Sequence, residues 1–99
     1  MGQITIKVHD VMHDAEDFSA NEIERHMVQM CTDLRVDDVR LAKGHRNSPI
    51  FITLKEEVTH ISMDDAKSIA GQMVSEFEQH VGSVETSRAL RDSNIRIQQ

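Results

Sequence analysis

The sequence is poor in aromatic side chains, with no Trp or Tyr and only three Phe among 99 residues. Few rings are available for stacking, so we expect the six Met to fill core volume that rings usually occupy, because Met adapts to irregular gaps. Cys31 is the only cysteine. A single cysteine excludes an internal disulfide and favours a reducing compartment.

Long apolar runs and positive charge are also scarce. No stretch approaches the ~18 apolar residues that a membrane span needs, and the N-terminal MGQITIKVHD has no apolar signal core. We therefore expect one cytoplasmic domain over residues 1–99, without membrane contact. The 17 acidic residues against 11 basic ones give a net charge of −6, which argues against direct binding of nucleic acid.

The first third of the chain predicts a strand followed by a helix. Residues 3–9 alternate between apolar and polar side chains, as in a half-buried strand. Ser19 and Glu22 have the spacing of a capping box, which predicts a helix that ends near Arg35. The predicted buried stripe of this helix consists of Ile23, Met27, Met30, Cys31 and Leu34.

The rest of the chain predicts a hairpin and a second helix. Residues 39–42 and 50–55 alternate like strands, and the turn-rich segment KGHRNSP joins them. A helix is expected from Ser62 to Gly82, because a long apolar stripe follows a second capping box and ends at a glycine. The segment VETSRALRDS predicts a further short helix, and NIRIQQ predicts a last strand with Ile95 and Ile97 facing inward.

The order strand, helix, strand, strand, helix, strand predicts an α+β fold. It fits a ferredoxin-like two-layer sandwich, β-α-β-β-α-β, in which two helices cover one face of an antiparallel sheet and leave the other face open. The terminal strand has the weakest pattern. The main alternative is a three-stranded sheet with an extra C-terminal helix.

Two histidines four residues apart, His9 and His13, are each followed by an aspartate and are candidate metal ligands. Zinc sites need three or four ligands, typically with histidines four apart on a helix or with a Cys/His set at fixed spacing. Here His9 ends a strand and His13 lies in a loop, so we expect an acidic, flexible connection without a metal or cofactor. A metal-binding protein that uses these histidines stays open as a further alternative.

Catalytic machinery is not expected. Cys31 lies in the predicted apolar stripe, whereas a nucleophilic thiol needs a base and an electropositive setting. Ser19 and Ser62 are accounted for as helix caps, and KGHRNSP lacks the glycines of a phosphate-binding loop. The protein is therefore predicted not to be an enzyme.

Charge is unevenly distributed along the chain. Residues 10–33 contain seven acids and one base, whereas residues 34–55 contain five bases and two acids. The acidic half predicts a surface that meets a basic protein through electrostatic complementarity. Its candidate residues are Asp14, Glu16, Asp17, Glu22 and Glu24.

An alternative surface is the open face of the sheet together with the KGHRNSP loop. Such a face binds single-stranded RNA in domains that place aromatic side chains on central strands. Only one aromatic is available for that role here, so the match is partial. The candidate residues are Lys7, Arg40, Lys43, Arg46, Phe51 and Lys55.

ITIKV followed by ERHMVQMC resembles the small T7-like phage proteins that bind the host's nucleoid-structuring silencer. The second amphipathic segment, MDDAKSIAGQMVSEFEQH, follows in the same order, so the resemblance covers the whole chain in outline but only residues 24–31 in detail. KGHRNSPI and ALRDSNIRIQQ have no clear counterpart, and no site residue is carried over. The resemblance implies a compact phage host-takeover protein without catalytic machinery that occupies a surface of a host protein.

The leading hypothesis is therefore a non-enzymatic inhibitor of a basic, nucleic-acid-associated host protein, such as a silencer, restriction enzyme or CRISPR component. A nucleic-acid-binding module is the second hypothesis, and a His/Asp metal-binding protein is the third. A homodimer is compatible with each of them, because a small sheet with edge strands and an open face often pairs.

Overall fold

The computed structural model describes residues 2–88 and 90–99. The strands are β1 (Thr5–Val8), β2 (Val36–Leu41), β3 (Ile50–Leu54) and β4 (Ile95–Gln98). The α-helices are α1 (Ala20–Met30) and α2 (Met63–Val81), and the 3₁₀ turns are η1 (Thr32–Leu34), η2 (Glu85–Arg88) and η3 (Asp92–Asn94). None of the helices in these two ranges has the length and apolar character needed to cross a bilayer.

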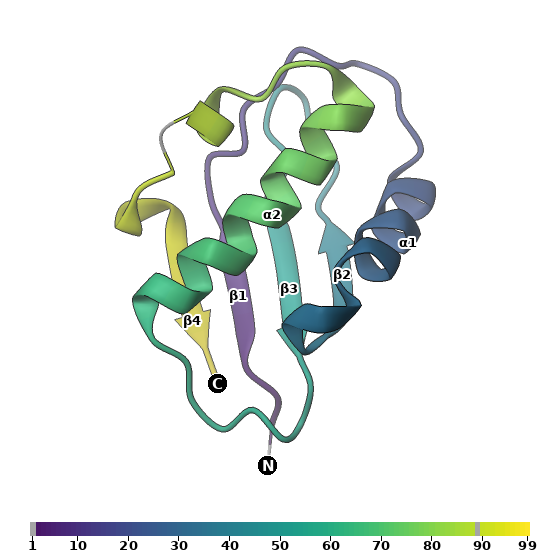
Figure 1. Ribbon diagram of the computed structural model, residues 1–99. Coiled ribbons are helices and arrows are strands. Elements are labelled where there is room, and N and C mark those ends of the chain that lie inside the picture. Colours follow the sequence, from purple (N-terminus) through teal and green to yellow (C-terminus); the bar gives the residue numbers. More distant parts are fainter. Residues whose placement is uncertain (1, 89) are drawn as a thin grey trace.

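The four strands form one antiparallel sheet in the order β2-β3-β1-β4, and both α-helices lie on the same side of it (Figure 1). The fold is thus α+β, as predicted, and is compatible with a ferredoxin-like sandwich. The alternative with three strands and a C-terminal helix is wrong. The tail pairs with β1 from Thr5↔Gln98 to Val8↔Ile95 and forms the fourth strand.

The core lies between the sheet and the helices, where the alternating strand residues meet the stripe of α2. Ile6 on β1 and Ile52 on β3 are fully buried and face each other across the ladder. Phe77 on α2 is also fully buried and is the only large ring among the fully buried side chains in the described part of the chain. Each such side chain contributes roughly 1.5–3 kcal/mol through the apolar area it removes from water.

The first helix is shorter than predicted. It begins after Ser19, whose hydroxyl accepts the Glu22 N–H at 3.4 Å, and it ends at Met30 instead of near Arg35. Arg35 has a left-handed backbone with φ of 58°, which turns the chain from η1 into β2. Met30 was predicted to be buried and is instead 63% exposed, because the shortened helix turns only Ile23 and Met27 fully inward.

The second helix agrees with its sequence signals. The hydroxyl of Ser62 accepts the Asp65 N–H at 3.1 Å at the start of α2. At the other end Gly82 has φ of 98°, a conformation that side chains disfavour, and its N–H donates to Glu78 O at 2.8 Å.

Two connections differ from their predictions. The β1–α1 connection, expected to be flexible, is anchored by buried Val11 and His13 and by isolated bridges from Met12 to Asn47 and from His13 to Val84. The segment VETSRALRDS does not form one helix. It contains η2 and the start of η3, while Ala89 lies outside the described residues.

Candidate binding surfaces

The sheet face opposite the helices carries three cations and one ring in a single row. The strand registers pair Arg40 with Phe51, Phe51 with Lys7, and Lys7 with Arg96. With strands spaced about 4.8 Å apart, this cationic row (Arg40, Phe51, Lys7 and Arg96) spans about 14 Å across all four strands. The Lys7 ammonium lies 5.2 Å from the centroid of the Phe51 ring, which is within the range of a cation–π contact.

Three of the predicted nucleic-acid-binding residues lie away from this row. Lys43 belongs to the loop between β2 and β3, where its ammonium donates to Phe18 O at 2.7 Å and lies 4.7 Å from the Phe18 ring centroid. Arg46 is exposed in the same loop, and its carbonyl accepts the His13 N–H at 3.1 Å. Lys55 is exposed just after β3.

Four of the five predicted acidic contact residues are exposed at one end of the sandwich. Asp14, Glu16 and Asp17 lie in the β1–α1 connection, and Glu22 lies in the first turn of α1. Asp17 is fully exposed and 4.0 Å from the ammonium of Lys43. A surface pair of this kind contributes little to stability, so the Asp17 carboxylate stays available to other molecules.

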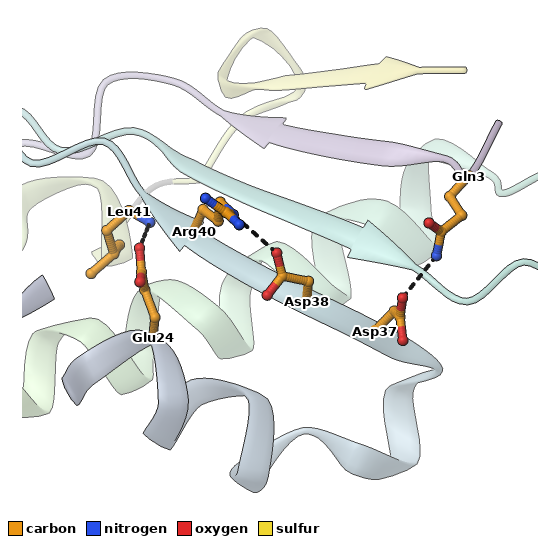
Figure 2. Close-up of polar contacts among 6 residues, drawn as sticks. All are labelled: Gln3, Glu24, Asp37, Asp38, Arg40 and Leu41. Atoms are coloured by element: carbon orange, nitrogen blue, oxygen red, sulfur yellow. Dashed lines mark hydrogen bonds and ion pairs between the residues drawn. The ribbon is translucent and has the colours of Figure 1, made fainter. Parts of the chain in front are cut away.

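Glu24 is not part of that exposed group. It is half-buried, and its carboxylate accepts the backbone N–H of Leu41 at 2.7 Å on the outer edge of β2 (Figure 2). A groove of about 420 Å³ runs between α1 and this edge. Along the same strand Gln3 donates to Asp37 at 2.9 Å, and Arg40 donates to Asp38 at 3.2 Å (Figure 2). Glu24 thus satisfies an edge group of the sheet, so its role is structural.

Among the described residues, His9 and His13 belong to no cluster of three metal-ligating side chains. His13 is only 4% exposed, packs edge-on between Phe18 and Phe77 with centroids 5.5 and 5.4 Å away, and hydrogen bonds Ser48 Oγ at 2.7 Å through Nε2. Burial lowers the pKa of His13, against smaller opposing effects from the Ala15 backbone and Asp14. A neutral imidazole committed to the core is a packing group.

The Cys31 thiol is buried at the end of α1, in agreement with its place in the predicted stripe. Burial raises its pKa, and the nearby charge of Glu76 raises it further. Both effects disfavour the thiolate, which is the reactive form. The geometry therefore offers no activated cysteine nucleophile.

A different histidine pair does converge. His26 on α1 faces His80 on α2, with Nδ1 and Nε2 3.0 Å apart, and Glu76 Oε1 lies 3.6 Å from the former and 3.7 Å from the latter. Sequence reasoning missed this cluster. Glu76 and His80, four apart on one helix, are a detectable signal, but the approach of His26 depends on how α1 packs against α2.

Comparison of the chain with protein-family models, with curated proteins and with solved structures finds no match in any of the three. The arrangement of the molecule is therefore the basis of the functional argument. The molecule is an α+β protein with three surface features: a cationic row on the open sheet face, exposed acids at one end, and a His–Glu–His cluster between its helices.

Proposed function

We propose that this protein is a small, non-enzymatic binding protein that occludes a basic surface of a nucleic-acid-associated host protein. The observation that carries the proposal is the grouping of Asp14, Glu16, Asp17 and Glu22 as exposed acids at one end of a chain with a net charge of −6. Silencers, restriction enzymes and CRISPR effectors carry basic DNA-binding surfaces. An acidic end of this size can compete with DNA there.

The resemblance of ITIKV and ERHMVQMC to the T7-like phage proteins supports a phage-type inhibitor working in the bacterial cytoplasm. The observed strand order and the placement of both helices on one face support assigning the fold to the ferredoxin-like sandwiches. In this proposal the sandwich acts as a rigid support, because the bridges at Met12 and His13 hold the acidic connection against the core.

The experiment is capture of host proteins from a nuclease-treated bacterial lysate, read by mass spectrometry, with wild type and a variant carrying Asp14→Lys, Glu16→Lys and Asp17→Lys. We expect the wild type to capture basic DNA- or RNA-binding proteins at about 150 mM salt, and to lose them steeply as salt is raised. The variant should lose them at every salt concentration.

A matched control carries Asp33→Lys, Glu56→Lys and Glu57→Lys, three exposed acids near the opposite end of the strands. It changes the net charge by the same amount and should retain capture. Equal capture by all three proteins would contradict the proposal. Mutual capture between copies of the chain would indicate instead that the surface mediates a homodimer.

A second candidate function is binding of single-stranded nucleic acid on the open sheet face. The observation in its favour is the register that aligns Arg40, Phe51, Lys7 and Arg96. A base stacked on Phe51 would place its flanking phosphates among cations on both sides. The acidic net charge opposes this function, because it repels the polyanion at a distance.

Fluorescence anisotropy with a labelled single-stranded RNA at low salt tests this candidate. Binding with a Kd below about 50 μM, within the range of weak electrostatic association, would support it if Phe51→Ala and Arg40→Ala each weaken it. Lys67→Ala is the control, because Lys67 lies on α2 and pairs with Asp92 at 3.0 Å, away from the sheet face. Absence of binding at that concentration dismisses the candidate.

A further inference from the structure

We propose that His26, Glu76 and His80 form a binding site for one divalent transition-metal ion, with zinc as the fitting ion, between α1 and α2. Two imidazoles and one carboxylate are a ligand set that zinc uses when solvent supplies the fourth position. The three ligand atoms are His26 Nδ1, Glu76 Oε1 and His80 Nε2. This site is independent of the binding function proposed above.

The spacing of the three atoms fits the ion. Their separations of 3.0, 3.6 and 3.7 Å define a triangle whose circumscribed circle has a radius of about 2.0 Å, and zinc binds nitrogen and carboxylate oxygen at about 2.0–2.2 Å. One ion near the plane of the triangle therefore reaches all three atoms. The three separations alone are thus compatible with one ion bound by all three side chains.

The burial of Glu76 is the second observation. Its side chain is only 10% exposed and is aimed at the two imidazoles, whereas the side chains of His26 and His80 are 51% and 28% exposed. A buried carboxylate is costly unless a cation or several donors compensate it. An ion bound there would meet the carboxylate on its protein side and a water molecule on its open side.

Without an ion, the cluster can be held only by hydrogen bonds. One imidazole N–H can donate to the facing nitrogen of the other ring, and a doubly protonated ring can pair with Glu76. Zinc would replace these interactions by three bonds at once. It would join α1 to α2 more strongly than side-chain packing and the His26–His80 hydrogen bond do, so binding should raise the stability of the whole domain.

The test uses the full chain without a polyhistidine tag, stripped with a chelator and titrated with zinc chloride against a chromophoric competitor. We expect one zinc per chain, and a rise in Tm of about 10 °C or more when free zinc is about 100 times its Kd. Cobalt in place of zinc should give the intense visible absorption of a tetrahedral site.

Three variants locate the ion: His26→Asn, His80→Asn and Glu76→Gln. Each removes a direct ligand, so each should weaken zinc binding by at least the roughly 10- to 100-fold that follows loss of an outer-shell partner. The two histidine variants keep the test decisive if Glu76→Gln disturbs folding, since both histidines reach the surface. Their Tm in chelator shows that they fold.

His60→Asn is the matched control, because His60 is an exposed histidine in the β3–α2 connection, outside the cluster. It should bind zinc as the wild type does. Zinc binding that survives in all three cluster variants would place the ion elsewhere and overturn the proposal. A cluster that binds no zinc, and whose variants lower Tm equally with and without zinc, would be a hydrogen-bonded helix contact and would overturn it as well.

Discussion

The Glu24 carboxylate accepts the backbone N–H of Leu41 at 2.7 Å, joining α1 to the outer edge of β2 (Figure 2). Edge strands present unpaired N–H groups that can recruit another chain. Here the Glu24 side chain of the same molecule binds the edge N–H of Leu41. The contact therefore stabilises the helix–sheet interface and also blocks strand addition at that position.

Replacing Glu24 by Ala should lower the free energy of unfolding by about 1–2 kcal/mol, because a hydrogen bond to a charged group is lost and its N–H partner is left at a half-buried edge. Glu24→Gln keeps a carbonyl acceptor and should lose less than half as much. Urea denaturation measures both, with Glu57→Ala as an exposed control that should be near neutral. A loss in Glu24→Gln equal to that in Glu24→Ala would show that the charge, and not the acceptor, is what matters.

Stability should fall with acid because of His13. Burial lowers its pKa from the model-compound value of 6.5, so the unfolded chain binds a proton more readily than the native protein does. The stability contributed by keeping the ring neutral is complete above pH 6.5 and is lost as the pH falls below it toward the lower native pKa. The measurement is the free energy of unfolding from about pH 7.5 to about pH 5 in wild type and in His13→Gln.

The variant should be less stable at neutral pH, because its core packing is altered, but its curve should be flatter in the acid range. His60→Asn serves as the matched substitution, since it removes an exposed histidine that lies outside the core. Parallel curves for wild type and His13→Gln would show that another group governs the acid response.

Cys31 should resist thiol reagents in the native protein. It is 4% exposed, and both burial and the charge of Glu76 raise its pKa, so the thiolate is rare and shielded. We expect labelling by a disulfide reagent to be at least about tenfold slower than in the urea-unfolded chain, because reaction must wait for opening of the structure. Rapid labelling under native conditions would place the end of α1 in an open conformation.

Gly71 within α2 and Gly82 just after its end should respond oppositely to substitution. Gly71→Ala should raise the free energy of unfolding by about 0.5–1 kcal/mol, because alanine favours helix and, among the described residues outside the helix's own backbone, the new Cβ would meet only Leu90 Cδ2, at an ordinary 4.0 Å. Gly82→Ala should lower it by about 1 kcal/mol or more, since φ of 98° strains any side chain. Thermal and urea unfolding of both variants against wild type provide the comparison.

The sheet and the second helix were predictable because their signals are local. Alternation around Ile52 marks a strand wherever that strand pairs, and Ser62 and Gly82 mark the ends of α2 through short-range backbone geometry. The early end of α1 was not predictable, because the left-handed turn at Arg35 follows from the entry of the chain into β2. Local patterns predict the presence of a helix or strand more readily than the residue at which it ends.

The sites depended on contacts that are distant in sequence. His13 lies among acids, so its segment resembles a solvated loop until its bridge to Val84 and its contact with Ser48 are known. Glu76 directly precedes Phe77 on α2. Its part in the cluster depends on its contact with His26 on α1, fifty residues earlier in the chain, which no local pattern predicts. The cationic row was foreseeable in part, because period-two alternation already placed Lys7 and Phe51 on the same face.

The pairing of β1 with β4 has a consequence for synthesis of the protein. β1 precedes both of its neighbours, β3 and β4, in the chain, and Thr5 can meet its partner Gln98 only when residues 95–98 have left the ribosome. During translation one edge of this central strand is open and exposes a ladder that other nascent chains can join. The sheet is therefore completed only once residues 95–98 are available, and until then this open edge can be recognised by chaperones and proteases.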